Sequence, residues 1–195
     1  LGHMSEGTDK LGSIRLTCVP AQHSSARTGW DKGTSLWAGF IIEQFACKPS
    51  TAPNRTAVYF AGDTGYRAEA KGAYCPAFEQ IGERFGPIDF SAIPIWRGGT
   101  LSFLASWGVR LHHEALTLAT HATPDDAVAI HSDVRSKASL GIHFATFAGS
   151  EDEATYPIGL LEEACLDASI PMDVTQVNGF GICDIGLTVL VPLRT

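Results

Sequence analysis

Three residues of metal-ligating type each stand at or near the end of a strand-like segment. His23 follows the run CVPAQ, Asp63 follows the run YFAG, and His143 lies within SLGIHFATF. They are 40 residues (63 − 23) and 80 residues (143 − 63) apart, so each belongs to a different β segment. Neutral imidazoles and a carboxylate that meet from separate strands can bind a borderline cation such as zinc. The spacing therefore favours a metal site at one edge of a sheet.

Asp63 also admits other interpretations. Asp followed by Thr-Gly is ordinary turn chemistry, and any one of the histidines can be a core residue with satisfied hydrogen bonds. The triplet DTG is also that of aspartic proteases, whose mechanism needs two carboxylates that share a proton. Only one such triplet occurs, flanked by Gly62 and Tyr66. That mechanism would therefore require a homodimer.

The segments that must position these residues alternate between β and α patterns. Thr123 is the expected N-cap of a helix that begins at Pro124 and carries Asp125 and Asp126 in its first turn. A closing hairpin is expected within 174–193. This alternation indicates an α/β domain whose helices cover a sheet. Strands are expected at 13–21, 35–43, 56–62, 89–95 and 138–147, and further helices at about 76–85 and 157–170.

Composition excludes several classes of protein. The 195 residues suit one domain, and 45% hydrophobic residues allow a packed core. A net charge of −7 argues against a nucleic-acid-binding protein held by general electrostatics. Five scattered cysteines without a CxxC pair favour a reducing, intracellular setting, cytoplasmic or peripheral on a membrane. No apolar run approaches the ~18 residues that a transmembrane helix needs.

The first residues differ from the rest. Residues 1–12 are polar and aperiodic, and GHM resembles a cloning remnant, so we expect a tag or linker there and the domain at 13–195.

Several words of the sequence occur in an order that belongs to a known family. They are VPAQH (19–23), SLW (35–37), YFAGDTGY (59–66), CPAFEQIGERFGPIDFSAIPI (75–95), TPDDAVAIHSDV (123–134) and SLGIHFATF (139–147). From about Ile14 to Phe147, and more weakly beyond, the chain resembles the N-acylphosphatidylethanolamine-hydrolysing phospholipase D branch of the metallo-β-lactamase superfamily. The resemblance implies an αββα sandwich that holds two zinc ions.

The resemblance also implies roles for individual residues. By position, His23 completes the ligands of the first zinc, Asp63 bridges both ions, and His143 binds the second. His121 matches a histidine beside the metal centre, near the substrate phosphate, although an exposed loop histidine is an equal alternative. His131 is expected to pack within its helix.

The chain departs from the family in three places. The HxHxDH motif, which supplies two ligands to each zinc, is absent. We therefore expect the C-terminal half of the catalytic domain, with the N-terminal half of that domain or a second copy as its partner. Ser24 replaces an aromatic residue, and an insertion runs from Trp96 to about Leu118, so the preference for acyl chain or head group is open.

The expected function of the full-length parent is that of a zinc-dependent phosphodiesterase. It would hydrolyse the phospholipid N-acylphosphatidylethanolamine to phosphatidic acid and an N-acylethanolamine, with Asp63 and His121 as catalytic residues. The chain alone is expected to be inactive. The alternatives are a non-catalytic half-domain that binds a partner or lipid and, more remotely, the homodimeric aspartic protease.

Overall fold

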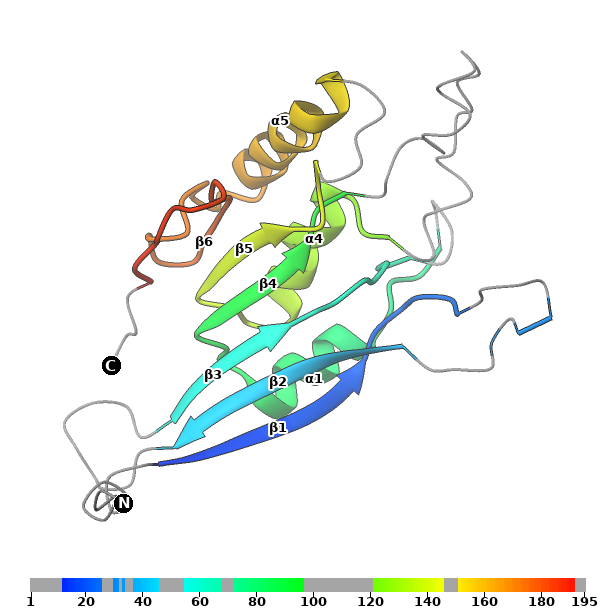
Figure 1. The fold of residues 1–195 in the computed structure, drawn as a ribbon, viewed down its shortest axis with the longest axis vertical. Coiled ribbons are helices and arrows are strands. Elements are labelled where there is room, and N and C mark those ends of the chain that lie inside the picture. Colours follow the sequence, from blue (N-terminus) through cyan, green and yellow to red (C-terminus); the bar gives the residue numbers. More distant parts are fainter. Residues whose placement is uncertain are drawn as a thin grey trace, which may run out of the picture.

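The computed structural model describes residues 12–25, 30, 31, 33, 37–45, 55–67, 72–96, 121–145 and 151–191, of which 151–153 only as backbone. Its elements form one mixed sheet with helices beside it (Figure 1). The strands are β1 Ser13–Pro20, β2 Ala38–Phe45, β3 Arg55–Phe60, β4 Phe90–Pro94, β5 Ala138–Ile142 and β6 Gly179–Gly181. The helices are α1 Ala77–Phe85, α4 Pro124–Asp133 and α5 Glu151–Asp167.

The six strands lie side by side in sequence order. The pairs β1–β2 and β2–β3 are antiparallel, whereas β3, β4, β5 and β6 pair in parallel. Consequently β1, β3, β4 and β5 all point toward the same edge of the sheet, and β2 points away from it (Figure 1).

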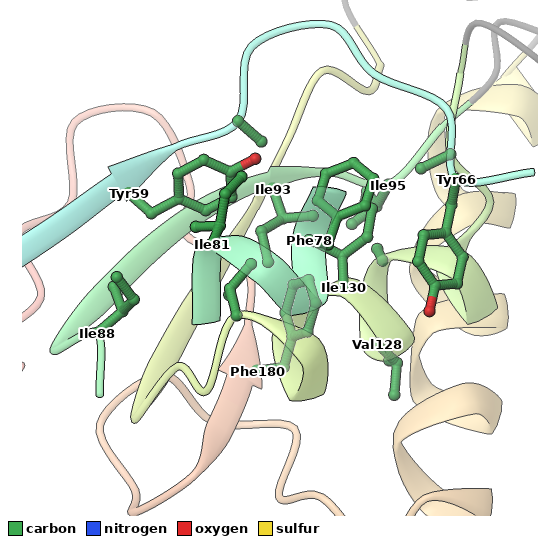
Figure 2. Packing of buried hydrophobic residues seen from close by; sticks show 14 of the residues in the cluster. Tyr59, Tyr66, Phe78, Ile81, Ile88, Ile93, Ile95, Val128, Ile130 and Phe180 are labelled. Carbon is green, nitrogen blue, oxygen red and sulfur yellow. The ribbon is translucent and has the colours of Figure 1, made fainter. Parts of the chain in front are cut away.

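Side chains on one face of the sheet form the core with the helices. Along β2 buried and exposed positions alternate, which is the period of a strand with one face covered. Tyr59 and Ile93 from the strands pack with Phe78 of α1 and Ile130 of α4 (Figure 2). Leu161 of α5 belongs to the same buried cluster. The helices therefore hold this face of the sheet rigidly in place.

The opposite face of the same strands is apolar and exposed. Register pairs Leu16 with Ile42 and Phe40 with Phe60, so these side chains share that face. Their exposed fractions are 64%, 38%, 38% and 45%, and that of Ile14 beside them is 73%. A row of this size is rarely left uncovered on a soluble monomer.

The expected strands and helices are present, with two corrections. α5 begins at Glu151 and not at Pro157, where we expected its first turn. Pro157 lies inside the helix. The expected closing hairpin is wrong: β6 has three residues and pairs in parallel with β5, and residues 182–191 form no strand. Ile185 and Leu190 point into solvent there. Alternating hydrophobicity can predict a strand, but it does not show whether a neighbouring strand is available for pairing.

Other expectations have a simpler outcome. No helix among the described residues has the length and apolar character to span a bilayer. Cys18, Cys75, Cys165 and Cys183 are free thiols. Some expectations concern residues outside the described ones: the tag or linker before Gly12, the first two residues of SLW (Ser35 and Leu36), Cys47, and the insertion after Trp96.

Candidate metal site

The edge toward which β1, β3 and β5 point receives one ligand-type residue after each strand. His23 follows β1 by three residues, Asp63 follows β3 by three, and His143 follows β5 directly. The carboxyl ends of parallel strands meet at one edge, where open α/β sheets commonly bind their ligands. The sheet topology thus explains how residues so distant in sequence come together.

Asp63 lies between two imidazoles. Its Oδ1 is 2.7 Å from Nε2 of His143, and its Oδ2 is 3.9 Å from Nε2 of His23. Gly62 precedes it at φ 66°, a conformation that favours glycine, and a Cβ there would lie 3.2 Å from the carbonyl oxygen of Ala38. The turn of the chain at Gly62 therefore directs one carboxylate oxygen toward each histidine.

His121 completes the cluster from the helix side. It precedes α4, whose N-cap Thr123 and Asp126 form a capping box. Its ring packs edge-on against that of His23, with centroids 5.1 Å apart, and is stacked on that of His143 at 5.3 Å. Ligand-type atoms of His23, Asp63 and His121 all lie within 4.8 Å of one another. The four residues form the candidate metal site.

Backbone carbonyl groups orient two of the imidazole rings. Nδ1 of His23 lies 2.6 Å from the carbonyl oxygen of Ser24, and Nδ1 of His143 lies 3.2 Å from that of Trp96. A carbonyl only accepts a hydrogen bond, so the proton belongs on Nδ1 in each ring. The carboxylate of Asp63 is an acceptor as well, so a proton or a cation must lie between its Oδ1 and Nε2 of His143, which are 2.7 Å apart. This arrangement of ligand and supporting carbonyl is common in metal sites.

His143 has an unusual backbone conformation. Its φ is 60°, in the left-handed region that side chains other than glycine rarely adopt. Strained residues of this kind cluster at functional sites, because the surrounding structure must hold them. The strain accompanies a ring whose Nδ1 reaches Trp96 and whose Nε2 reaches Asp63.

The site contains buried nitrogen atoms without hydrogen-bond partners. They are Nε2 of His23 and Nδ1 of His121. Burial lowers the pKa of His121 below its ordinary value of 6.5; the Asp63 carboxylate opposes this shift, while the imidazoles of His143 and His23 add to it. The ring is therefore neutral at neutral pH and retains a lone pair. Imidazoles that converge around one carboxylate fit a divalent cation of the zinc class.

The structure brings together all the residues that the sequence nominated. His23, Asp63 and His143 converge at one edge as expected, although their role as ligands stays a prediction. His121 is part of the cluster, which does not match the alternative of an exposed loop histidine. His131 is buried in α4, where it contacts Ser139 and Asn178, and this confirms its packing role.

The homodimeric aspartic protease stays an alternative of the sequence, because its second carboxylate would come from another copy of the chain. Within the described part of the chain, Asp63 lies against the imidazoles of His143 and His23, whereas that mechanism needs a second carboxylate. The carbonyl groups of Ser24 and Trp96, which orient two of the imidazole rings, were not predicted from the sequence. Every residue has a carbonyl group, so no residue type marks the ones that orient a ligand.

Comparison with known proteins agrees with this site. A family profile described as a beta-lactamase superfamily domain matches residues 4–144, a range that contains all four residues of the candidate metal site. N-acyl-phosphatidylethanolamine-hydrolyzing phospholipase D 1 of Caenorhabditis elegans is 33% identical over 162 residues, which is 83% of this chain and 35% of that protein.

Two further relatives extend the comparison. The mitochondrial N-acyl-phosphatidylethanolamine-hydrolyzing phospholipase D of Saccharomyces cerevisiae is 27% identical over 148 residues, 75% of this chain and 26% of that protein. The chain thus spans about a third or less of the length of these curated relatives. The solved structure of Igni18, a metallo hydrolase from Ignicoccus hospitalis, has the same fold. Its TM-score is 0.51 at 20% identity, over 93% of this chain and 54% of that one. On its fold, its site and these matches, the chain belongs to the metallo-β-lactamase superfamily and resembles the branch that contains the N-acylphosphatidylethanolamine-hydrolysing phospholipases D.

Proposed function

We propose that the protein is a zinc-dependent phosphodiesterase of the phospholipase D type that hydrolyses N-acylphosphatidylethanolamine. The observation that carries this proposal is the Asp63 carboxylate, which directs one oxygen toward Nε2 of His143 and the other toward Nε2 of His23. A carboxylate between two such nitrogens suits a bridge between two cations. The names of the relatives in nematode and yeast support the choice of substrate.

Each residue of the candidate metal site has its own proposed role. His23 and Asp63 would hold one zinc ion, Asp63 and His143 the second, and ligands from HxHxDH would complete both. Two bound metal ions supply Lewis-acid stabilisation of phosphoryl charge and lower the pKa of water. His121 is neutral and lies beside both other rings, so it can donate one hydrogen bond to a phosphate oxygen.

The proposed reaction is a hydrolysis at phosphorus. The oxygen of water forms a bond to phosphorus, and the bond from phosphorus to the ethanolamine oxygen breaks. The ethanolamine oxygen takes up a proton, which yields an N-acylethanolamine, and phosphatidic acid retains the phosphate. Because the substrate is a membrane phospholipid, the reaction would take place at a membrane surface.

The test compares the 195-residue chain alone with the chain combined with an HxHxDH-bearing half-domain from a relative. We expect zinc-dependent release of N-acylethanolamine only from the combination, because the chain alone offers each of two zinc ions no more than two of the three protein ligands usual for catalytic zinc. Asp63→Asn should abolish turnover in the combination. Asp167→Asn, an exposed aspartate on α5, is the matched control and should leave turnover unchanged. Turnover that survives Asp63→Asn would overturn the proposal.

We also propose that the exposed apolar sheet face packs against a second sheet, which carries HxHxDH. Leu16, Phe40, Ile42 and Phe60 make this face continuous across three strands. The sandwich implied by the family needs a second sheet there, and this chain covers 54% of the metallo hydrolase that shares its fold. Burial of such side chains stabilises an interface by about 25 cal/mol for each Å² of apolar surface.

Substitution on this face tests the second sheet. Leu16→Glu should prevent assembly with the HxHxDH-bearing half, as measured by co-elution in size-exclusion chromatography. Leu166→Glu, at a 78% exposed position of α5, is the control and should not affect assembly. If the chain forms only a dimer with itself, and Leu16→Glu dissociates that dimer, the occupant is a second copy and the second-sheet proposal fails.

A non-catalytic half-domain is the second candidate function. It is favoured by the absence of HxHxDH from the sequence together with the uncovered apolar face. Elemental analysis of the assembled protein separates the two candidates. Two zinc ions for each assembly support the phosphodiesterase, whereas a stable assembly without metal and without turnover supports the binding module.

A further inference from the structure

Thr64, the residue after Asp63, is fully buried and contacts two of the segments that carry the histidines. Its Oγ1 accepts a hydrogen bond of 2.8 Å from the backbone N–H of Gln22. Its backbone carbonyl accepts one of 2.7 Å from the N–H of Ala122. Gln22 precedes His23, and Ala122 follows His121, so both bonds end one residue away from a member of the candidate metal site.

The contact between Thr64 and Gln22 is reciprocal. The carbonyl oxygen of Gln22 accepts a 2.6 Å bond from the N–H of Gly65. The Thr64 hydroxyl can donate its own proton to the carbonyl of Gly65 at 2.9 Å or to that of Gln22 at 3.3 Å. The hydroxyl therefore acts as acceptor and donor at once, which a methyl group of the same size cannot do.

We infer that Thr64 is a positioning residue, which sets the separation of His23, Asp63 and His121 through its hydroxyl and its backbone carbonyl. The inference rests on the proposed function, in which these side chains serve the metal centre. Asp63 is bonded directly to Thr64, so any shift of Thr64 moves the carboxylate. The segments of His23 and His121 have no strand pairing at these positions, because β1 ends at Pro20 and α4 begins at Pro124.

Loss of the hydroxyl has a predictable cost. In Thr64→Val the partly buried N–H of Gln22 would face a methyl group, and the chain would move to find water or another acceptor. His23 would move with it. Substitutions that disturb the partners supporting a metal ligand typically weaken metal binding by ~10–100-fold. We expect the affinity of the chain, combined with the HxHxDH-bearing half, for Co²⁺ to fall about 10-fold, as followed by the visible absorption of the bound ion.

A conservative variant and a control variant separate the effect of Thr64 on the position of the ligands from its effect on the stability of the fold. Thr64→Ser keeps the hydroxyl, so its Co²⁺ affinity should stay within about twofold of the unsubstituted chain. Ser91→Ala removes another buried hydroxyl, one that donates to Ser136 at 2.8 Å, and should leave Co²⁺ affinity unchanged. Equal affinity in Thr64→Val and the unsubstituted chain would overturn the inference. An equal loss in Thr64→Ser and Thr64→Val would overturn it too, because the methyl would then be responsible.

Amide hydrogen exchange gives a readout that needs no metal. The amide of Gln22 should exchange at least about 10-fold faster in Thr64→Val than in Thr64→Ser, since only the latter retains the acceptor. The amide of Gly86, bonded to Gly82 in α1, is the internal control. If Thr64→Val does not fold, the pair Thr64→Ser and Thr64→Ala makes the same comparison. If the unsubstituted combination of the chain with the HxHxDH-bearing half binds no Co²⁺, the proposed function loses its support, and unchanged exchange at Gln22 would separately overturn the role of Thr64.

Discussion

Buried polar groups are hydrogen-bonded within the protein at one edge of the sheet, whereas some of them lack hydrogen-bond partners at the opposite edge. At the edge where β3 and β4 begin, Glu43 accepts from Arg55 at 2.8 Å and lies 3.5 Å from Arg15. Asp89 accepts from Lys137 at 2.7 Å and from the backbone N–H of Ala57 at 2.8 Å. Each buried carboxylate there has its hydrogen bonds within the protein.

At the edge where β1, β3 and β5 end, the polar groups are left incomplete. Nε2 of His23 and Nδ1 of His121 are buried and have no hydrogen-bond partner. Buried polar atoms are nearly always paired, and the exceptions often mark a ligand or an ion. A cluster whose hydrogen bonds are satisfied holds the fold together, whereas a convergent cluster with unsatisfied atoms is available for chemistry.

Asp63→Asn is the strongest test of this difference. We expect Co²⁺ affinity to fall on the order of 1000-fold, beyond the ~10–100-fold typical of supporting partners, because a direct ligand loses its charge. The free energy of unfolding without metal should change by less than about 0.5 kcal/mol, since the side chain is 46% exposed. Isothermal titration with Co²⁺ and urea denaturation measure the two quantities. A large loss of stability with intact Co²⁺ binding would show that Asp63 stabilises the fold and does not bind the cation.

Glu43→Gln should have the opposite outcome. Removing the charge of the nearly buried Glu43 side chain leaves Arg55 without its ion-pair partner. We therefore expect the free energy of unfolding to fall by about 2–3 kcal/mol. Co²⁺ affinity should remain unchanged, because the substitution lies at the other edge. Urea denaturation in the presence of EDTA gives the stability. Weakened Co²⁺ binding in this variant would show that the two edges are coupled.

Thr123→Ala has a smaller expected effect and concerns the helix that joins the two edges. Thr123 accepts from the N–H of Asp126 at 3.1 Å, and loss of an N-cap typically costs about 1 kcal/mol. We expect that decrease in the free energy of unfolding by urea denaturation. Thr123→Ser, which keeps the capping oxygen, should recover most of it. No difference between the alanine and serine variants would contradict a role for the cap.

The smallest expected effect is a pH dependence at His131. Burial lowers its pKa below 6.5, and the hydrogen bond with Asn178 opposes this shift in part. The unfolded chain therefore binds the proton more readily, so the contribution of neutral His131 to stability is complete above pH 6.5. It is lost as the pH falls from 6.5 toward the lower folded pKa. Arg135 and Lys137 line the same cavity.

Urea denaturation of the EDTA-treated chain between pH 7.5 and 5.5 measures this dependence. His131→Gln should reduce the loss of stability on acidification, whatever its effect at pH 7.5. An identical pH profile in both proteins would show that the slope arises elsewhere, and His121 at the other edge would then be the first group to test.

The sequence predicted most elements because local signals agree with tertiary structure. Pro124 after a capping threonine marks the start of α4, and alternating side chains mark β2. The start of α5 was missed because Pro157 has the same signature inside a helix as at its first turn. The hairpin near the C-terminus was predicted wrongly because pairing depends on a neighbouring strand, which no local pattern contains.

The candidate metal site was predictable in its residue types and not in its geometry. Histidine and aspartate at strand ends identify the group, as His23 and Asp63 show. The contacts that orient the rings come from backbone carbonyl groups, such as those of Ser24 and Trp96. The role of Thr64 depends on hydrogen bonds across 42 residues of sequence, which only the folded chain reveals.

The convergence of four distant segments has a consequence for how the protein folds. Residues near positions 23, 63, 121 and 143 meet only after the long loops between them have closed, and contacts of such separation form slowly. An early, partly collapsed chain that contains β3 and α1 alone therefore has no grouping of these side chains. Capture of the cation must be a late event in folding, and the colour of bound Co²⁺ would report the moment at which β5 docks and brings His143 to the site.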